Sequence, residues 1–284
     1  MNPCRYAFIP AGNSLFLRIE EDTFMYPYIY IFDRQIGTYG LCMMVGFWLA
    51  GILALRKGKP LGLKMEDLVI VAAMTFGGTL VGGGLLYVFV TYPIDQIIEF
   101  IRQGDFRFLA SGLVFYGGLV GGGLCALLGA KISKCSLSVL ERSVVPFIPL
   151  GHAVGRIGCV MAGCCHGFEY DGPLALYYPH SLTGLSPDKG YFPVQPLESV
   201  LNVGICLFLL WYEKKMKRTF ELLLLYLGLY SVSRFFLEML RGDSIRGVWS
   251  GFSTSQYISI ALLAVSVIGV VWCRKSAPKS EASA

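Results

Sequence analysis

The sequence predicts an all-α membrane protein with seven transmembrane helices, its N-terminus outside and its C-terminus in the cytoplasm. Charged residues make up only 15% of the 284 residues and apolar residues 55%, whereas soluble domains carry about 25% charged residues. Mean hydropathy is +0.59, and the apolar residues gather in runs of about 20, the length with which a helix crosses a bilayer. Basic residues concentrate between the runs on one side, as they do in cytoplasmic connections.

Residues 1–36 are expected to form an outer N-terminal surface segment. They contain Pro, Gly and an acidic cluster, and they lack the basic start and apolar core of a cleavable signal peptide. Aromatic residues alternate with others between positions 24 and 32, a pattern that predicts a short strand or an interfacial aromatic segment.

The seven predicted spans form one membrane domain over residues 37–275. In chain order they lie near residues 37–55, 68–91, 109–130, 145–165, 194–212, 219–240 and 253–273. Residues 167–193 form the one long connection, on the outer side, and residues 276–284 form a polar cytoplasmic tail. Because long loops in compact proteins are often functional, the outer loop is a candidate part of a site.

The predicted orientation follows from the basic residues after the odd-numbered spans. A basic group follows each of these four spans, and the groups begin at Arg56, Lys131, Lys214 and Arg274. The same bias explains the net charge of +5, so we expect no nucleic acid partner.

Glycine runs predict close helix contacts. Gly117 and Gly118 follow Tyr116 in the third span, and residues 82–84 of the second span are all glycine. Glycine inside a helix costs about 1 kcal/mol relative to alanine, so such a run indicates tight packing or a broken helix. Tyr116 is the residue beside this run that could have a chemical role.

Arg156 lies inside the fourth predicted span, between Gly155 and Gly158. A charged side chain in mid-membrane costs about 2.5–3.5 kcal/mol even on lenient scales, so it must face a polar cavity, a partner or an anion. His152, one turn earlier, is expected to be a hydrogen-bonded packing residue.

Arg234 shares a helix face with Tyr230 and Glu238, and Arg241 follows nearby. Two interpretations stay open for this group. Glu238 could simply neutralise Arg234 as an ion pair. We favour the alternative, in which Glu238 orients the guanidinium and leaves part of it for a ligand. Since arginine matches phosphate geometry well, the two arginines predict an anion-binding chamber within the bundle.

Cys159, Cys164 and Cys165 precede His166, a set of residue types that can bind metals. They lack the paired C-x₂-C spacing of structural zinc sites. Core packing is the favoured interpretation, ahead of a reactive thiol or acceptor and of a metal ligand set. We therefore expect no metal and no cofactor.

Several motifs, in order, resemble those of the bacterial prolipoprotein diacylglyceryl transferase family. They cover nearly the whole predicted membrane domain. The matching residues are Tyr39-Gly40-Leu41, Gly155-Arg156-Ile157-Gly158 with Gly167, Pro193 to Glu198 with Gln195, and Tyr230, Arg234, Phe235, Glu238 and Arg241.

The resemblance implies an enzyme of the bacterial cytoplasmic (inner) membrane that takes phosphatidylglycerol and a prolipoprotein. Such an enzyme moves diacylglyceryl to the lipobox cysteine thiol, forms a thioether and releases glycerol phosphate. The catalytic residues implied are Arg156, Arg234, Tyr116 and Glu238. The substrate-binding residues implied are Tyr39, Tyr230, Gly155, Gly158, Gly167, Gln195 and Arg241.

Three positions depart from the family pattern. Tyr116 stands where the family has a histidine, and Cys159 and Cys164 stand where it has asparagine and glutamate. This combination predicts that phosphate binding is retained while proton handling or the acceptor has changed. An acceptor thiol would then lose its proton to Tyr116, His152 or water.

The sequence is also compatible with three alternatives. A divergent transferase could use another acceptor, with Cys159, Cys164 or Cys165 as nucleophile or acceptor. A non-enzymatic lipid or anion transporter would also need buried arginines. A membrane thiol-redox or metal protein would use the cysteine cluster but would leave the arginines unexplained.

Overall fold

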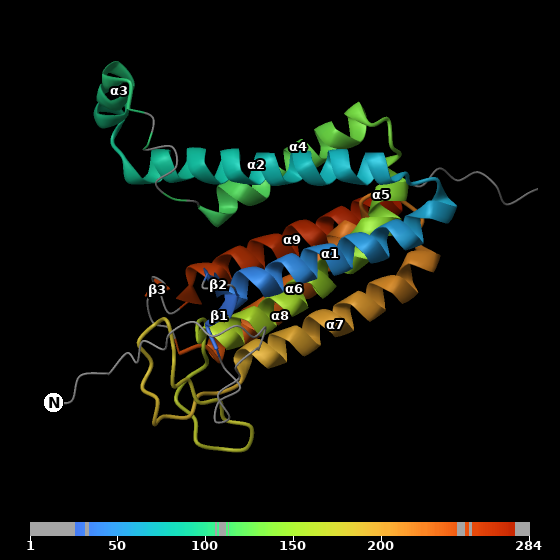
Figure 1. Cartoon of the computed structure of the whole chain (residues 1–284). Helices are drawn as coiled ribbons and strands as arrows, with labels where there is room; N and C mark the ends of the chain where they lie inside the picture. Colours follow the sequence, from blue (N-terminus) through green and yellow to red (C-terminus); the bar gives the residue numbers. More distant parts are fainter. Residues whose placement is uncertain are drawn as a thin grey trace, which may run out of the picture.

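The computed structural model is mainly helical, with two short sheets (Figure 1). It describes residues 26–31, 34–105, 107, 112, 114–242, 248–249 and 252–275, apart from the side chains at 31, 115, 116, 248 and 249. The strands are β1 (Tyr28–Ile31), β2 (Arg34–Gly37), β3 (Val248–Trp249) and β4 (Phe252–Ser253). The helices are α1 (Thr38–Gly58), η1 (Lys59–Leu61), α2 (Met65–Thr91), α3 (Ile94–Gln103), α4 (Phe115–Ile132), α5 (Leu137–Val144), η3 (Val145–Phe147), α6 (Ile148–Ala162), α7 (Val194–Tyr212), η4 (Glu213–Lys215), α8 (Glu221–Met239) and α9 (Thr254–Lys275).

Within the described residues, six helical segments are long and apolar enough to cross a membrane. They correspond to α1 with η1, α2, α5 through α6, α7 with η4, α8 and α9. The apolar part of α4, Gly117–Ile132, is shorter. An all-α membrane protein is thus confirmed with six candidate spans, and the seventh stays a prediction.

Two predicted spans have different limits in the structure. The span predicted at 145–165 begins already at Leu137, because η3 joins α5 to α6. It ends at Ala162, where Gly163 adopts a left-handed φ of 63° and caps the helix. Cys164 and Cys165 therefore lie beyond the helix. The span predicted at 109–130 corresponds to α4, which begins at Phe115.

The aromatic alternation near the N-terminus forms a strand over its described part. β1 pairs with β2 in an antiparallel hairpin, with Tyr28 opposite Gly37 and Tyr30 opposite Gln35. Phe24 and Phe32 of the same pattern lie outside the described residues. The second sheet pairs β3 with β4 just before α9.

Helix α2 packs mainly on α4, and this pair stands beside a group formed by α1, α6, α7, α8 and α9 (Figure 1). The α2–α4 contact runs along glycines, as the sequence predicts. A Cβ at Gly82 would lie 2.3 Å from the Gly117 carbonyl oxygen, and one at Gly78 would lie 2.5 Å from that of Gly121. The helix backbones touch because no side chain intervenes.

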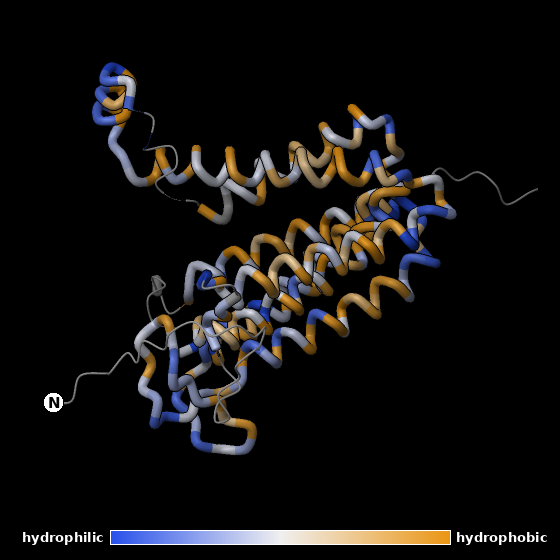
Figure 2. Tube along the Cα trace, in the orientation of Figure 1, coloured by the Kyte–Doolittle hydropathy of each residue, from blue (hydrophilic) through white to orange (hydrophobic). Residues whose placement is uncertain are grey.

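The long connection 167–193 lies at the end of the bundle opposite α5 (Figure 1). The helices are largely hydrophobic along their length, and hydrophilic residues gather toward both ends (Figure 2). A cluster of Val145, Ile205, Leu209, Met216 and Leu222 buries the contact of η3, α7 and α8 near the α5 end. Interior polar residues lie between α6, α7 and α8.

Candidate functional site

Arg156 lies on α6 with its side chain only 13% exposed. Its Nη2 atom is 2.8 Å from Oε1 of Glu198, a carboxylate on α7 that is 2% exposed. The sequence predicts that Arg156 is buried and needs a compensating group, and the structure supplies Glu198. Nothing in the spacing pointed to Glu198 as this partner, because the two residues are on different helices.

His152 of α6 lies next to Glu198 and also next to Tyr230, a residue of α8. Its Nε2 atom is 3.6 Å from the same Glu198 oxygen, and its ring lies 5.2 Å, centroid to centroid, from that of Tyr230. Residues of α6, α7 and α8 therefore meet at one point. The expectation that His152 is only a packing residue accounts for its ring contact but not for its place beside a buried carboxylate.

Arg234 and Glu238 form the ion pair that their spacing predicts. Arg234 Nη2 is 2.5 Å from Glu238 Oε2, with the two side chains 11% and 7% exposed. The same nitrogen also lies 3.5 Å from the hydroxyl of Ser255 on α9. One nitrogen of the guanidinium thus contacts both Glu238 of its own helix and Ser255 of α9.

The two arginines, although each is paired with its own glutamate, act on the same pair of side chains. His152 and Tyr230 both experience the charges of Arg156 and Arg234. Each guanidinium also keeps a buried N–H without a hydrogen-bond partner among the described residues, Nε of Arg156 and Nη1 of Arg234. Because buried donors are rarely left unsatisfied, these two are candidate contacts for a ligand.

Glycines on α6 bring α1 close to Arg156. A Cβ at Gly155 would lie 2.8 Å from the Met43 sulfur, and one at Gly158 would lie 2.9 Å from Cys42 Cβ. Gly158 also places the Tyr39 backbone against α6, so that the Tyr39 hydroxyl experiences the charge of Arg156. These glycines thus let α1 approach α6 closely, and the direct part in substrate binding that the resemblance implies stays a prediction.

The Gln195 side chain, at the start of α7, contacts the end of α6 and the outer loop rather than the two arginines. Its Nε2 donates to the Cys164 carbonyl oxygen and to the Tyr178 hydroxyl, both at 2.9 Å. Tyr178 comes from the outer loop, and burial raises its pKa to about 12. The sequence did not single out Tyr178. Gln195 therefore ties the outer loop to the end of α6.

Gly167 and Arg241 lie side by side. They form an isolated antiparallel bridge, which ties the start of the outer loop to the residues after α8. A Cβ at Gly167 would lie 2.4 Å from the Phe192 carbonyl oxygen. Arg241 is also in contact with the Cys165 thiol. These two residues are thus adjacent to the cysteine cluster.

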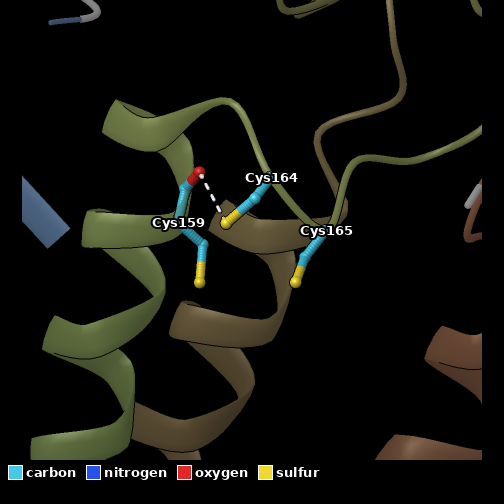
Figure 3. A group of neighbouring side chains, drawn as sticks. All are labelled: Cys159, Cys164 and Cys165. Carbon is cyan, nitrogen blue, oxygen red and sulfur yellow. Dashed lines mark hydrogen bonds between the residues drawn. The ribbon is translucent and has the colours of Figure 1, made fainter. Parts of the chain in front are cut away.

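Cys159, Cys164 and Cys165 come together, with Cys159 buried and the other two partly buried. Figure 3 shows their side chains around a common space at the end of α6. The Cys159 sulfur lies 3.8 Å from Nη1 of Arg156. The cluster therefore directly adjoins the arginine site. Tyr116 lies in the first turn of α4, and its side chain is outside the described residues, so its role stays a prediction.

Comparison with known proteins identifies the family. The prolipoprotein diacylglyceryl transferase family matches residues 27–272. The phosphatidylglycerol–prolipoprotein diacylglyceryl transferase 2 of Clostridium perfringens is 34% identical over 235 residues, covering 82% of this chain and 89% of that protein. The corresponding transferase of Clostridium tetani is 32% identical over 84% of this chain and 93% of its own length. The chain therefore belongs to the prolipoprotein diacylglyceryl transferase family and is a membrane transferase of that family.

Proposed function

We propose that the protein moves the diacylglyceryl group of phosphatidylglycerol to the lipobox cysteine thiol of prolipoproteins. The acceptor sulfur attacks the glyceryl carbon that carries the phosphoester oxygen. A C–S bond forms, the C–O bond breaks, and glycerol phosphate leaves with the bonding electron pair. The names of the relatives describe this donor and this class of acceptor.

The observation that carries the proposal is the pair of buried guanidinium groups with one unpartnered N–H each. The departing phosphate gains negative charge in the transition state, and prearranged cationic donors in a dry site stabilise that charge strongly. Glu198 and Glu238 balance the two arginines before the lipid arrives. The site can therefore exist in the membrane without two bare charges.

His152 is the proposed acceptor of the thiol proton. It lies beside Glu198 and Tyr230. Glu198 can hold the ring in place and offset part of the charge of the imidazolium that forms beside Arg156, as a carboxylate does for a catalytic histidine. We also propose that Tyr230 and Glu238 orient the arginines, and that Tyr39, Gly155, Gly158, Gly167, Gln195 and Arg241 shape the site around both substrates.

We propose that the chain lies in the bacterial cytoplasmic membrane with the N-terminus outside, α4 as a seventh span and residues 276–284 in the cytoplasm. Basic residues near the ends of α1, α4, α7 and α9 gather at the α5 end of the bundle (Figures 1 and 2). This distribution supports placing that end in the cytoplasm. The outer loop 167–193 would then meet prolipoproteins outside.

The test supplies purified protein in detergent with phosphatidylglycerol labelled in its acyl chains and with a lipobox peptide. We expect labelled thioether peptide and an equal amount of glycerol phosphate. Arg156→Lys and Arg234→Lys keep the charge but lose the planar fork, and we expect each to abolish most of the product. Arg274→Lys, which alters an exposed arginine paired with Glu221, is the matched control.

A second candidate function rests on the Cys159 thiol beside Arg156. In that case phosphatidylglycerol is consumed without peptide product, and intact-protein mass spectrometry finds a diacylglyceryl adduct on Cys159, Cys164 or Cys165. Binding of the labelled lipid without any covalent product would instead favour a lipid or anion transporter.

A further inference from the structure

Three cysteine sulfurs converge at the end of α6. The Sγ atoms of Cys159, Cys164 and Cys165 all lie within 4.8 Å of one another. In Figure 3 the three side chains, one from the helix and two from the turn after it, border one common space. Among the described residues, no other group of three His, Cys, Asp or Glu side chains brings ligand atoms this close.

The backbone is bent so as to produce this convergence. Gly163 ends the helix, and the Cys164 N–H then donates to the Cys159 carbonyl oxygen at 3.1 Å. Cys165 has a φ of 58°, a left-handed conformation that residues with a Cβ rarely adopt. Such conformations cluster at functional sites.

Neighbouring side chains hold the turn through its backbone carbonyls, while the Cys164 thiol donates to the Cys159 carbonyl oxygen at 3.8 Å (Figure 3). Gln195 on α7 donates to the Cys164 carbonyl oxygen. The hydroxyls of Ser181 and Thr183 donate to the Gly163 carbonyl oxygen at 3.0 and 2.9 Å. The turn is therefore fixed from α7 and from the outer loop. Prearranged ligand positions of this kind favour ion binding, because little order is lost when the ion arrives.

The spacing fits a bound ion better than a disulfide. With metal–sulfur bonds of about 2.3 Å, three sulfurs around a central ion lie about 4.0 Å apart. The observed group needs only a small contraction to reach that arrangement. A disulfide requires about 2.05 Å between two sulfurs and would leave the third thiol unused.

The charges around the cluster also fit. Three thiolates with one monovalent or divalent cation carry a net negative charge. Arg156 lies 3.8 Å from the Cys159 sulfur on one side, and Arg241 contacts Cys165 on the other. Arg241, and in part Arg156, which is also paired with Glu198, can therefore offset the charge of the loaded site.

We propose that Cys159, Cys164 and Cys165 form a binding site for one thiophilic d¹⁰ metal cation. Thiolate ligands select Cu(I) and Zn(II) over harder ions. Cu(I) would be held by the three sulfurs alone, and Zn(II) would add water as its fourth ligand. Binding releases the thiol protons to water, so the affinity rises with pH. The cysteine spacing gave no metal expectation, because the three sulfurs meet only through the turn after α6.

The test uses the full-length protein in detergent, reduced and then freed of reductant without oxygen. Zn(II) and Cu(I) are each titrated in competition with a coloured chelator of known affinity. We expect one ion per chain for at least one metal. Binding of Cu(I) but not Zn(II) supports the three-sulfur arrangement, and tighter binding of Zn(II) supports the site completed by water.

We expect Cys159→Ser, Cys164→Ser and Cys165→Ser each to weaken this binding at least about 100-fold, since each removes a ligand. Cys273→Ser, at the far end of α9, is the matched control and should bind as the parent does. Alkylating the thiols of the unmodified protein should also abolish binding, which tests the site without a substitution. Size-exclusion elution verifies that each variant is folded.

Several results would overturn the proposal. One is that the parent protein binds no more metal ions per chain than the variant in which all three cysteines are serine. Another is binding that survives the three serine substitutions but is lost in Cys273→Ser. A third is a disulfide between two of the three cysteines that persists after reduction and leaves no metal bound.

Discussion

Oxygen Oε1 of Glu198 lies 2.8 Å from Nη2 of Arg156, and this ion pair crosses from α6 to α7. The same oxygen is 3.6 Å from Nε2 of His152. One buried carboxylate thus positions both the cation proposed to bind phosphate and the base proposed to take the thiol proton.

Glu198→Gln should destabilise the protein strongly. The amide keeps the size of the side chain but leaves the buried Arg156 charge uncompensated, and breaking one partner of a buried pair costs about 3–5 kcal/mol. Thermal unfolding in detergent measures the loss. Glu169→Gln is the control, because the Lys189–Glu169 pair is exposed, 51% and 64%, and such pairs contribute about 1 kcal/mol or less. Equal shifts in the two variants would contradict the buried role of Glu198.

His152→Gln should lower kcat by about 100-fold or more while changing the KM for phosphatidylglycerol little, because a general base contributes about 10²–10⁴-fold to rate. The amide can still contact Glu198, so the fold should persist. The measurement is thioether formation as a function of both substrates. Tyr226→Phe serves as control, since the Tyr226 ring lies 6.1 Å, centroid to centroid, from that of Tyr230, whereas the ring beside His152 is that of Tyr230 itself. A kcat within a factor of about two of the parent would remove His152 from the mechanism.

Gly158→Ala should destabilise the α1–α6 contact. The new Cβ would lie 2.9 Å from Cys42 Cβ and 3.2 Å from the Tyr39 Cα, and such overpacking costs about 1–3 kcal/mol. Gly51→Ala on α1 is the matched helical control, because nothing lies within 4 Å of its new Cβ. There the gain in helix propensity of about 1 kcal/mol should raise stability instead. Thermal unfolding of the two variants should therefore shift in opposite directions, and shifts of the same sign would refute the close contact.

Tyr178 should make the protein less stable at high pH. Burial raises its folded-state pKa to about 12, above the usual value of about 10. The neutral phenol is favoured in the folded chain, so its contribution is complete below about pH 10 and is lost as the pH rises toward 12. We expect Tyr178→Phe to lose less thermal stability than the parent over this pH range. A parallel decline in both proteins would show that Tyr178 ionises normally.

The parts of the site that lie within one helix are predictable from sequence. Glu238 follows Arg234 by one turn, so their ion pair follows from helix geometry alone. The partner of Arg156 is different. Glu198 lies 42 positions further along the chain, and only the packing of α7 on α6 brings the two together. A sequence shows that a buried charge needs compensation, but it does not show which distant group provides it.

Sequence alone determined the membrane class, the approximate helices, the glycine contact of α2 with α4 and the burial of both arginines. These follow from composition and from periodic patterns, which reflect local backbone geometry and the cost of charge in an apolar environment. Tertiary structure decided that His152 meets Tyr230, that Glu198 serves Arg156 and that three cysteines share one space. Each of these depends on how separate segments turn and pack, because side chains far apart in the chain approach one another only when the whole bundle has formed.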